Sequence, residues 1–164
     1  MKLNEFIEIV EGIKLNKQDK DVKKISDIEW HIFHENRKYV FQVDRIMDTY
    51  NIYWYLEGPK GEQYIELPKE LKNNKSMIPL FNKVVTALYQ FLKLKRPDNF
   101  VFSAHKKLGK IYLMMLSMLD YEDIFTNYLN RKSYEQNDKI YVYFSRKNET
   151  ITEERLNEIL KLVI

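Results

Sequence analysis

Apolar and polar residues alternate with a period of two over residues 28–67 of the chain. Runs at 28–32, 39–43 and 52–56 place an apolar residue at every second position. Such a period puts apolar side chains on one face of a β-strand and polar side chains on the other. The pattern predicts four strands, of which the last is QYIEL at 63–67.

Turn residues separate these predicted strands. HENRK at 34–38 fits a hairpin turn, and EGPKGE at 57–62 carries two glycines and a proline. Because hairpin turns join antiparallel neighbours, we predict an antiparallel meander of four strands. The polar segment KLNKQDKDVKK at 14–24, which precedes the meander, is predicted to be a loop or the frayed end of a helix.

Apolar residues at helical spacing predict helices in the rest of the chain. One helix is expected at 3–13, and a strong helix is expected at 77–93, where the sequence is MIPLFNKVVTALYQFLK. Further helical segments are predicted at 105–119 and 120–131. The amphipathic segment ETITEERLNEILKLVI, at 149–164, is predicted to close the chain as a helix.

Capping residues mark two of these helix starts. Ser76 is a suitable N-cap for the strong helix, whose first turn tolerates Pro79. Thr150 and Glu153 have the spacing of a capping box before the last helix. The core-facing stripe predicted for the strong helix consists of Ile78, Phe81, Val85, Leu88 and Leu92.

Two further strands complete the predicted sheet. FVF at 100–102 indicates a short buried strand, and KIYVYFSR at 139–146 indicates another. Because strands and helices alternate in the second half, part of the sheet should be parallel, with helices packed on it. We therefore predict a single α+β domain, residues 1–164, in which a mixed sheet combines the antiparallel meander with strand–helix–strand units.

Composition narrows the function only slightly. The net charge is +3, from 27 basic and 24 acidic residues, which is weak support for an anionic partner. Cysteine is absent, which excludes disulfides and thiolate chemistry and fits a reducing cytoplasm. Acidic residues interrupt the apolar N-terminal stretch MKLNEFIEIVEGIK, so no signal peptide is expected. The longest apolar run, IYLMMLSML, is about half of the roughly 18 residues that span a membrane.

Few residues suggest metal chemistry. His31 and His34 are three positions apart on or near a strand, so their side chains should point to opposite faces, and we expect surface or hairpin residues rather than metal ligands. Glu70 and Lys72 have a nuclease-like spacing downstream of two aspartates, Asp44 and Asp48. However, Glu70 follows a proline in a predicted loop, which does not aim two carboxylates at one metal.

Basic residues crowd two predicted helix starts. His105, Lys106, Lys107 and Lys110 lie where the dipole of the 105–119 helix is positive, a position that acidic residues normally occupy. They are either solvated or they close over an anion bound to free N–H groups. The loop before the 77–93 helix carries three more lysines: Lys69, Lys72 and Lys75.

Short motifs in the second half resemble the GNAT family of N-acetyltransferases. They are Ser103-Ala104, then Lys107, then Ile111-Tyr112, with Leu119-Asp120-Tyr121 at the helix end. Small phage-encoded proteins with this fold show a similar pattern, including a turn such as Arg96-Pro97-Asp98. The resemblance implies an acetyltransferase-like layout, with the predicted strand–helix order of residues 62–145 following the meander.

The resemblance also implies roles for individual residues. Tyr112 falls where family members keep a tyrosine as general acid near the thiol of coenzyme A, and Glu57 or Glu66 could supply a base. The residue pattern alone gives a different interpretation, because Tyr112 lies on the apolar stripe of its predicted helix and fits a core position with its hydroxyl bonded at the edge.

One loop departs from the family pattern. Family members carry a glycine-rich motif before the first long helix of this half, where backbone N–H groups approach the cofactor pyrophosphate. Here the loop is PKELKNNKSMIP, which has no glycine. We therefore predict a non-catalytic binding protein of phage or mobile-element type, without a cofactor, that contacts a protein or nucleic acid through the basic loops. The alternative is an active N-acetyltransferase that uses acetyl-CoA.

Overall fold

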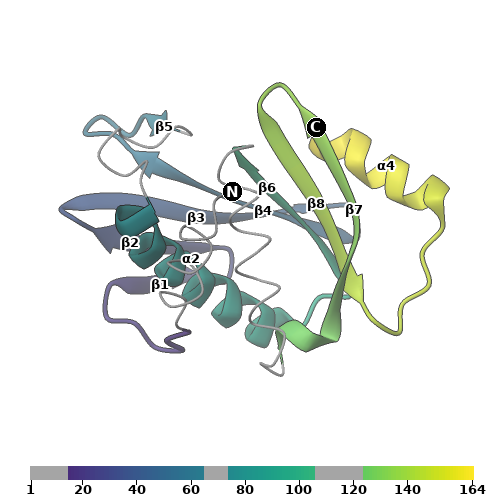
Figure 1. Ribbon diagram of the computed structural model, residues 1–164, viewed down its shortest axis with the longest axis horizontal. Coiled ribbons are helices and arrows are strands. Elements are labelled where there is room, and N and C mark those ends of the chain that lie inside the picture. The colour runs from purple at the N-terminus through teal and green to yellow at the C-terminus, as the bar shows by residue number, and fades with distance from the viewer. Residues whose placement is uncertain (1–14, 65–73, 106–123) are drawn as a thin grey trace.

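The computed structural model describes residues 15–64, 74–105 and 124–164. Within these ranges eight strands form one sheet, and helices pack on it (Figure 1). The strands are β1 (Val22–Ser26), β2 (Glu29–His34), β3 (Arg37–Ile46), β4 (Thr49–Glu57), β5 (Gln63–Tyr64), β6 (Asn99–His105), β7 (Tyr128–Gln136) and β8 (Lys139–Arg146). The helices are α2 (Asn74–Lys95), α4 (Glu153–Val163) and the short 3-10 helix η2 (Phe125–Asn127).

The sheet is mixed, as the sequence predicts. Its strand order is β1-β2-β3-β4-β6-β8-β7, and β5 pairs with one end of β4. The contact between β4 and β6 is parallel, whereas the other neighbours are antiparallel. The α+β class and the meander of β2, β3, β4 and β5 are therefore confirmed.

Left-handed backbone conformations form the tight turns. Glu35 and Asn36, within the predicted HENRK turn, have φ angles of 48° and 60°. Asn137 and Asp138 between β7 and β8 have φ angles of 51° and 64°. Two consecutive positive φ values are the mark of a type I′ turn, which matches the twist of the strands that it joins. In the predicted EGPKGE turn, the Gly58 N–H donates to the Glu62 carbonyl over 2.8 Å.

Helix α2 builds the main core against one face of the sheet. All five residues of the predicted stripe are buried, so this prediction is confirmed. They pack with Trp30, Phe41 and other alternate strand residues in one cluster. The described part of α2 already begins at Asn74, so Ser76 lies inside the helix and is not its N-cap. No helix among the described residues has the length and apolar character needed to cross a membrane.

Helix α4 covers the opposite face over β6 and β8. Leu156, Ile159 and Leu160 pack on Val101 and Tyr143 in a second, smaller cluster. The helix begins after Thr152, whose hydroxyl accepts from the Arg155 N–H over 3.2 Å. The predicted cap at Thr150 is therefore wrong, because Thr152 has the extended backbone that an N-cap needs.

Two edge strands differ from the prediction. β1 occupies part of the segment 14–24, for which the sequence predicts a loop or the frayed end of a helix, and only Val22 of this strand is buried. Exposed lysines suit an edge strand because they oppose pairing with another sheet, but they hide the alternation of a strand. β7 replaces the end of the helix predicted at 120–131, because pairing with β8 outweighs local helical spacing. The predicted helix at 3–13 lies outside the described residues.

Candidate functional site

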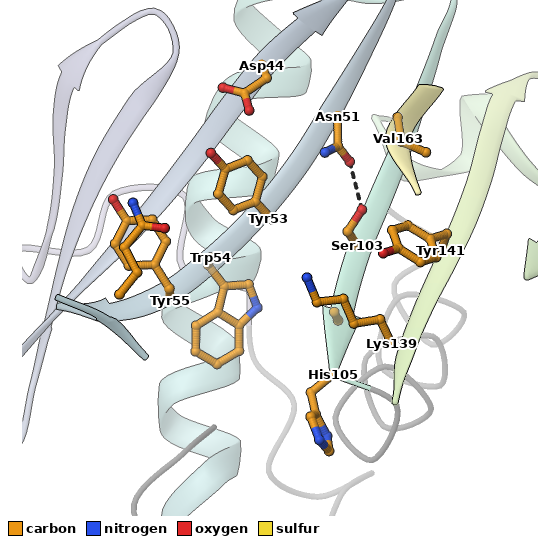
Figure 2. Close-up of a pocket in the computed structure, with 12 residues that line it drawn as sticks. Asp44, Asn51, Tyr53, Trp54, Tyr55, Ser103, His105, Lys139, Tyr141 and Val163 are labelled. Atoms are coloured by element: carbon orange, nitrogen blue, oxygen red, sulfur yellow. Dashed lines mark hydrogen bonds between the residues drawn. The ribbon is translucent and has the colours of Figure 1, made fainter. Parts of the chain in front are cut away.

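The parallel strands β4 and β6 separate partway along their length. Their register runs from Tyr50 opposite Phe100 to Ile52 opposite Phe102. Beyond that point β4 continues beside β3, while β6 continues beside β8. The gap between the diverging ends forms a pocket of about 300 Å³ (Figure 2). A crevice at the carboxyl ends of parallel strands is a common ligand site in open sheets.

A hydrogen bond closes the narrow end of the pocket. The Ser103 hydroxyl on β6 donates to the Asn51 side-chain oxygen on β4 over 2.7 Å. The bond crosses the strand pair where the backbone register ends, as Figure 2 shows. It fixes the point from which the two strands diverge, and it satisfies two polar groups in the pocket wall.

Aromatic residues of β4 form one wall. Tyr53 and Tyr55 stack with ring centres 6.2 Å apart and an interplanar angle of 25°. Alternation along the strand places both rings on the face opposite α2, while Trp54 between them joins the main core. Trp54 also lines the pocket, because the departure of β6 uncovers the edge of β4 at this position.

Asp44 and burial together hold the Tyr53 hydroxyl neutral. Burial is the largest cause that raises the pKa of Tyr53 to about 12, and the charge and hydrogen bond of the Asp44 carboxylate add to it. Figure 2 shows the Tyr53 hydroxyl pointing toward Asp44 on β3. A tyrosine in this state donates hydrogen bonds at neutral pH and does not act as a base.

We expect Tyr53 to ionise well above the ordinary tyrosine value. Because the folded-state pKa is raised from 10.0 to about 12, its contribution to stability is full below pH 10 and is lost as the pH rises toward 12. Tyrosinate absorbance against pH, compared with Tyr53→Phe, measures the shift. Asp44→Asn should lower the pKa of Tyr53, and a Tyr53 that ionises near its ordinary value would contradict the assignment.

The other wall comes from β6, β8 and α4. Tyr141 is buried, which raises the pKa of its hydroxyl. Lys139 lies opposite His105 in the β6–β8 register, and its side chain reaches over β6 toward the gap (Figure 2). Val163 at the end of α4 completes this side. The pocket therefore joins aromatic walls to one ammonium group.

The structure places one residue of the predicted basic site in this pocket. His105 lines it, but as the last residue of β6 rather than at the start of a helix, because it pairs with Lys139 in the sheet. Lys75 lies in α2, of which only the backbone is described at this position. The remaining candidates lie outside the described residues: Lys69, Lys72, Lys106, Lys107, Lys110 and Tyr112.

The other candidate acids and histidines have structural partners. Glu57, a candidate base, pairs with Lys38 over 2.8 Å, and Glu66 lies outside the described residues. His31 contacts the Glu29 carboxylate over 2.7 Å. His34 is buried beside the Lys83 ammonium and pairs with Arg37 across the β2–β3 hairpin turn, so of the expected surface or hairpin position the structure shows the hairpin.

Metal chemistry gains no support from the described part of the chain. No three histidine, aspartate or glutamate side chains there come close enough to hold an ion. Asp44, one of the nuclease-like candidates, lines the pocket beside Tyr53. Asp48 instead pairs with Arg155 of α4, and Glu70 lies outside the described residues.

Sequence reasoning missed most of the pocket. The sequence analysis covers Tyr53 and Tyr55 only as positions between the apolar residues of the strand at 52–56, and Tyr141 only as part of the strand at 139–146. The available signal was the run of three aromatic residues at 53–55, which places rings on both faces of one strand. Other elements must pack on both faces of such a strand, because otherwise its aromatic rings are exposed and can contact a ligand.

Comparisons with models of protein families, with curated proteins and with solved structures find no match to this chain.

Proposed function

We propose that the chain is a non-catalytic binding protein with an acetyltransferase-like arrangement of strands. Its ligand is an extended peptide segment of a partner protein, which enters the pocket between β4 and β6. The observation that carries the proposal is the separation of these two parallel strands after Ile52 and Phe102. The basic residues at 69–75 and 105–110 remain a predicted second contact face.

The diverging strands offer backbone groups to such a peptide. On the side of β4 that faces the pocket, Tyr53 and Tyr55 pair with no strand among the residues that the structure describes. The same holds for Ser103 and Ala104 on the pocket side of β6. Backbone N–H and C=O groups need hydrogen-bond partners, and an extended peptide presents both along its length. Addition of a strand is a common way to recognise peptides.

The walls favour a peptide with an aromatic or aliphatic side chain and an acidic one. Tyr53, Tyr55 and Tyr141 supply large rigid surfaces, and aromatic residues are enriched where proteins bind one another. Lys139 is the ammonium group that reaches the gap. A carboxylate in the ligand would pair with it and fix the direction of the peptide.

The polar groups of the pocket support binding rather than bond chemistry. Asn51 and Ser103 bond to each other, and the Asp44 carboxylate helps to raise the pKa of Tyr53. The Asn51 side chain and the Ser103 hydroxyl therefore already have a partner in the wall, and Tyr53 stays protonated at neutral pH. A group that shuttles protons needs a pKa near the working pH.

Selection from a random heptapeptide display library tests the proposal. Peptides enriched on the wild-type chain should lose binding to Ser103→Leu, which fills the narrow end of the pocket. They should still bind Ser133→Leu, the same change at an exposed serine of β7 outside the pocket. No enrichment, or equal binding to both variants, would overturn the proposal.

The second candidate function is N-acetyl transfer from acetyl-CoA. The same separated strands favour it, because coenzyme A carries a flexible chain with amide groups that can also bond to strand edges. Calorimetric titration with acetyl-CoA distinguishes the two functions. Micromolar binding that Ser103→Leu abolishes and Ser133→Leu retains would support the transferase, whereas no binding at millimolar acetyl-CoA would exclude it.

A further inference from the structure

A second pocket, of about 510 Å³, lies at the opposite end of β6. It forms where α2 ends, β7 begins and β8 ends. Its basic members are Arg96, Arg146 and Lys147, and two amides, Asn127 and Asn148, also line it. β6 has seven residues, so this pocket is roughly 20 Å from the one between β4 and β6.

The lining has a marked charge imbalance. Three cationic side chains line the pocket, and none of its lining residues is acidic. The carboxylate found nearby, Asp98, approaches Arg146 at 3.7 Å but has a side chain that is 66% exposed. Among the described residues, the Arg96 guanidinium and the Lys147 ammonium have no hydrogen-bond or ion-pair partner. A concave site with free cations attracts anions.

Arg146 is held in place by backbone carbonyls. Its Nε donates to the Pro97 carbonyl over 3.2 Å, and its Nη2 donates to the Arg96 carbonyl. The Tyr128 hydroxyl donates to the same Pro97 carbonyl over 2.6 Å. These bonds fix the guanidinium before any ligand arrives, which reduces the entropy lost on binding. Its remaining N–H groups can donate hydrogen bonds to a planar or tetrahedral oxyanion.

Arg96 occupies a backbone position that glycine fills at lower cost. Its φ angle is 44°, and its N–H donates to the Leu92 carbonyl over 2.9 Å, which caps the C-terminus of α2. Residues at this left-handed cap are usually glycine, since a side chain there costs about 1 kcal/mol. Favourable charge at the helix end does not require Arg96, because Lys93 and Lys95 already lie in the last turn.

We propose that Arg96, Arg146 and Lys147 bind a phosphate group of a nucleotide or a nucleic-acid strand. A phosphate ester offers the oxygens that match guanidinium groups in pairs and an ammonium singly. The amides of Asn127 and Asn148 can bond to the sugar or base beside it. The site is independent of the pocket between β4 and β6, so either proposal can fail alone.

Binding is measured with two probes on the full chain, adenosine 5′-monophosphate by calorimetry and a fluorescent oligothymidine by anisotropy. Arg96→Gly is the decisive variant, because it removes a cation and also places glycine at a position with a positive φ angle, which a side chain adopts only at a cost. We expect Arg96→Gly to weaken phosphate binding by about tenfold or more. The slope of the logarithm of the binding constant against the logarithm of the salt concentration should fall by about one. Its melting temperature should equal or exceed that of the wild type.

A matched set completes the test. Lys147→Gln should weaken binding as Arg96→Gly does, while Lys161→Gln on α4, outside the pocket, should not. Saturable monophosphate binding that depends on Arg96 supports a nucleotide site, and oligothymidine binding with a steeper salt slope supports a nucleic-acid strand. Binding of neither probe at low salt, or binding equal in all variants, would overturn the proposal.

Discussion

Trp30→Ala should destabilise the fold by about 3–5 kcal/mol, the range expected when a large aromatic side chain is removed from a core. Trp30 is fully buried on β2. Its ring meets Phe41 and Phe91 edge to face, at centre distances of 5.7 and 6.2 Å. This destabilisation is a large part of the free energy of unfolding of an ordinary domain, which is roughly 5–15 kcal/mol. Urea unfolding followed by circular dichroism gives the change in free energy.

A hydrogen bond adds to the effect of this substitution. Trp30 Nε1 donates to Gln90 Oε1 over 2.9 Å, and Gln90 in turn donates to the Lys17 carbonyl over 3.1 Å. Trp30→Phe keeps most of the apolar surface but leaves the Gln90 oxygen without this donor, so it should cost about 1–3 kcal/mol beyond the lost ring area.

The control is Phe33→Ala on the same strand. Phe33 is 38% exposed, and we expect its loss to cost less than about 1 kcal/mol. If Trp30→Ala stayed within 1 kcal/mol of the wild type, α2 and the meander would not share the core described above.

Long periodic segments were predictable because the core imposes their pattern. The α2 stripe and the strand at 139–146 follow the periods of a helix and of a strand buried on both faces. β1 and β7 lie at the two edges of the sheet, where one side of the strand is open and charged residues are tolerated. Their sequences therefore carry little alternation, and only their pairing with β2 and β8 defines them.

The candidate pockets were harder to predict because each depends on distant parts of the chain. Ser103 meets Asn51 across 52 positions, and Arg146 meets the Arg96 carbonyl across 50. No local pattern encodes such contacts. The sequence did single out His105 and the Arg96-Pro97-Asp98 turn, which lie at opposite ends of β6. It could not show that one opens onto a gap between strands and the other onto a basic pocket.

Arg131 connects the sheet to the segment that leads into α4. Its Nε donates to the Ser145 hydroxyl over 2.7 Å. Its Nη2 lies within bonding distance of the carbonyls of Arg146, Lys147 and Glu149, at 3.0, 3.3 and 3.0 Å. The β7–β8 register shifts between Asn130 and Lys132, so Arg131 is the extra residue of a bulge. A bulge of this kind redirects one side chain, here across the end of β8.

Arg131→Met should therefore cost about 2–4 kcal/mol, because charge-assisted hydrogen bonds contribute about 1.5–3 kcal/mol each and their loss leaves carbonyls without this donor. Arg131→Lys should recover less than half of the loss, since a single ammonium cannot reproduce the planar fork. The measurement is the free energy of unfolding in urea for both variants.

Lys132→Met provides the neighbouring control for this prediction. Lys132 forms an ion pair with Glu153, whose side chain is 70% exposed, and removal of such a surface pair should cost less than about 1 kcal/mol. If Lys132→Met and Arg131→Met lowered the free energy of unfolding equally, Arg131 would contribute only its positive charge and not its hydrogen bonds to the carbonyls. The expected difference would show that Arg131 holds the carbonyls of Arg146 and Lys147. It would then also position the basic pocket, so Arg131→Met should weaken phosphate binding under conditions where the variant remains folded.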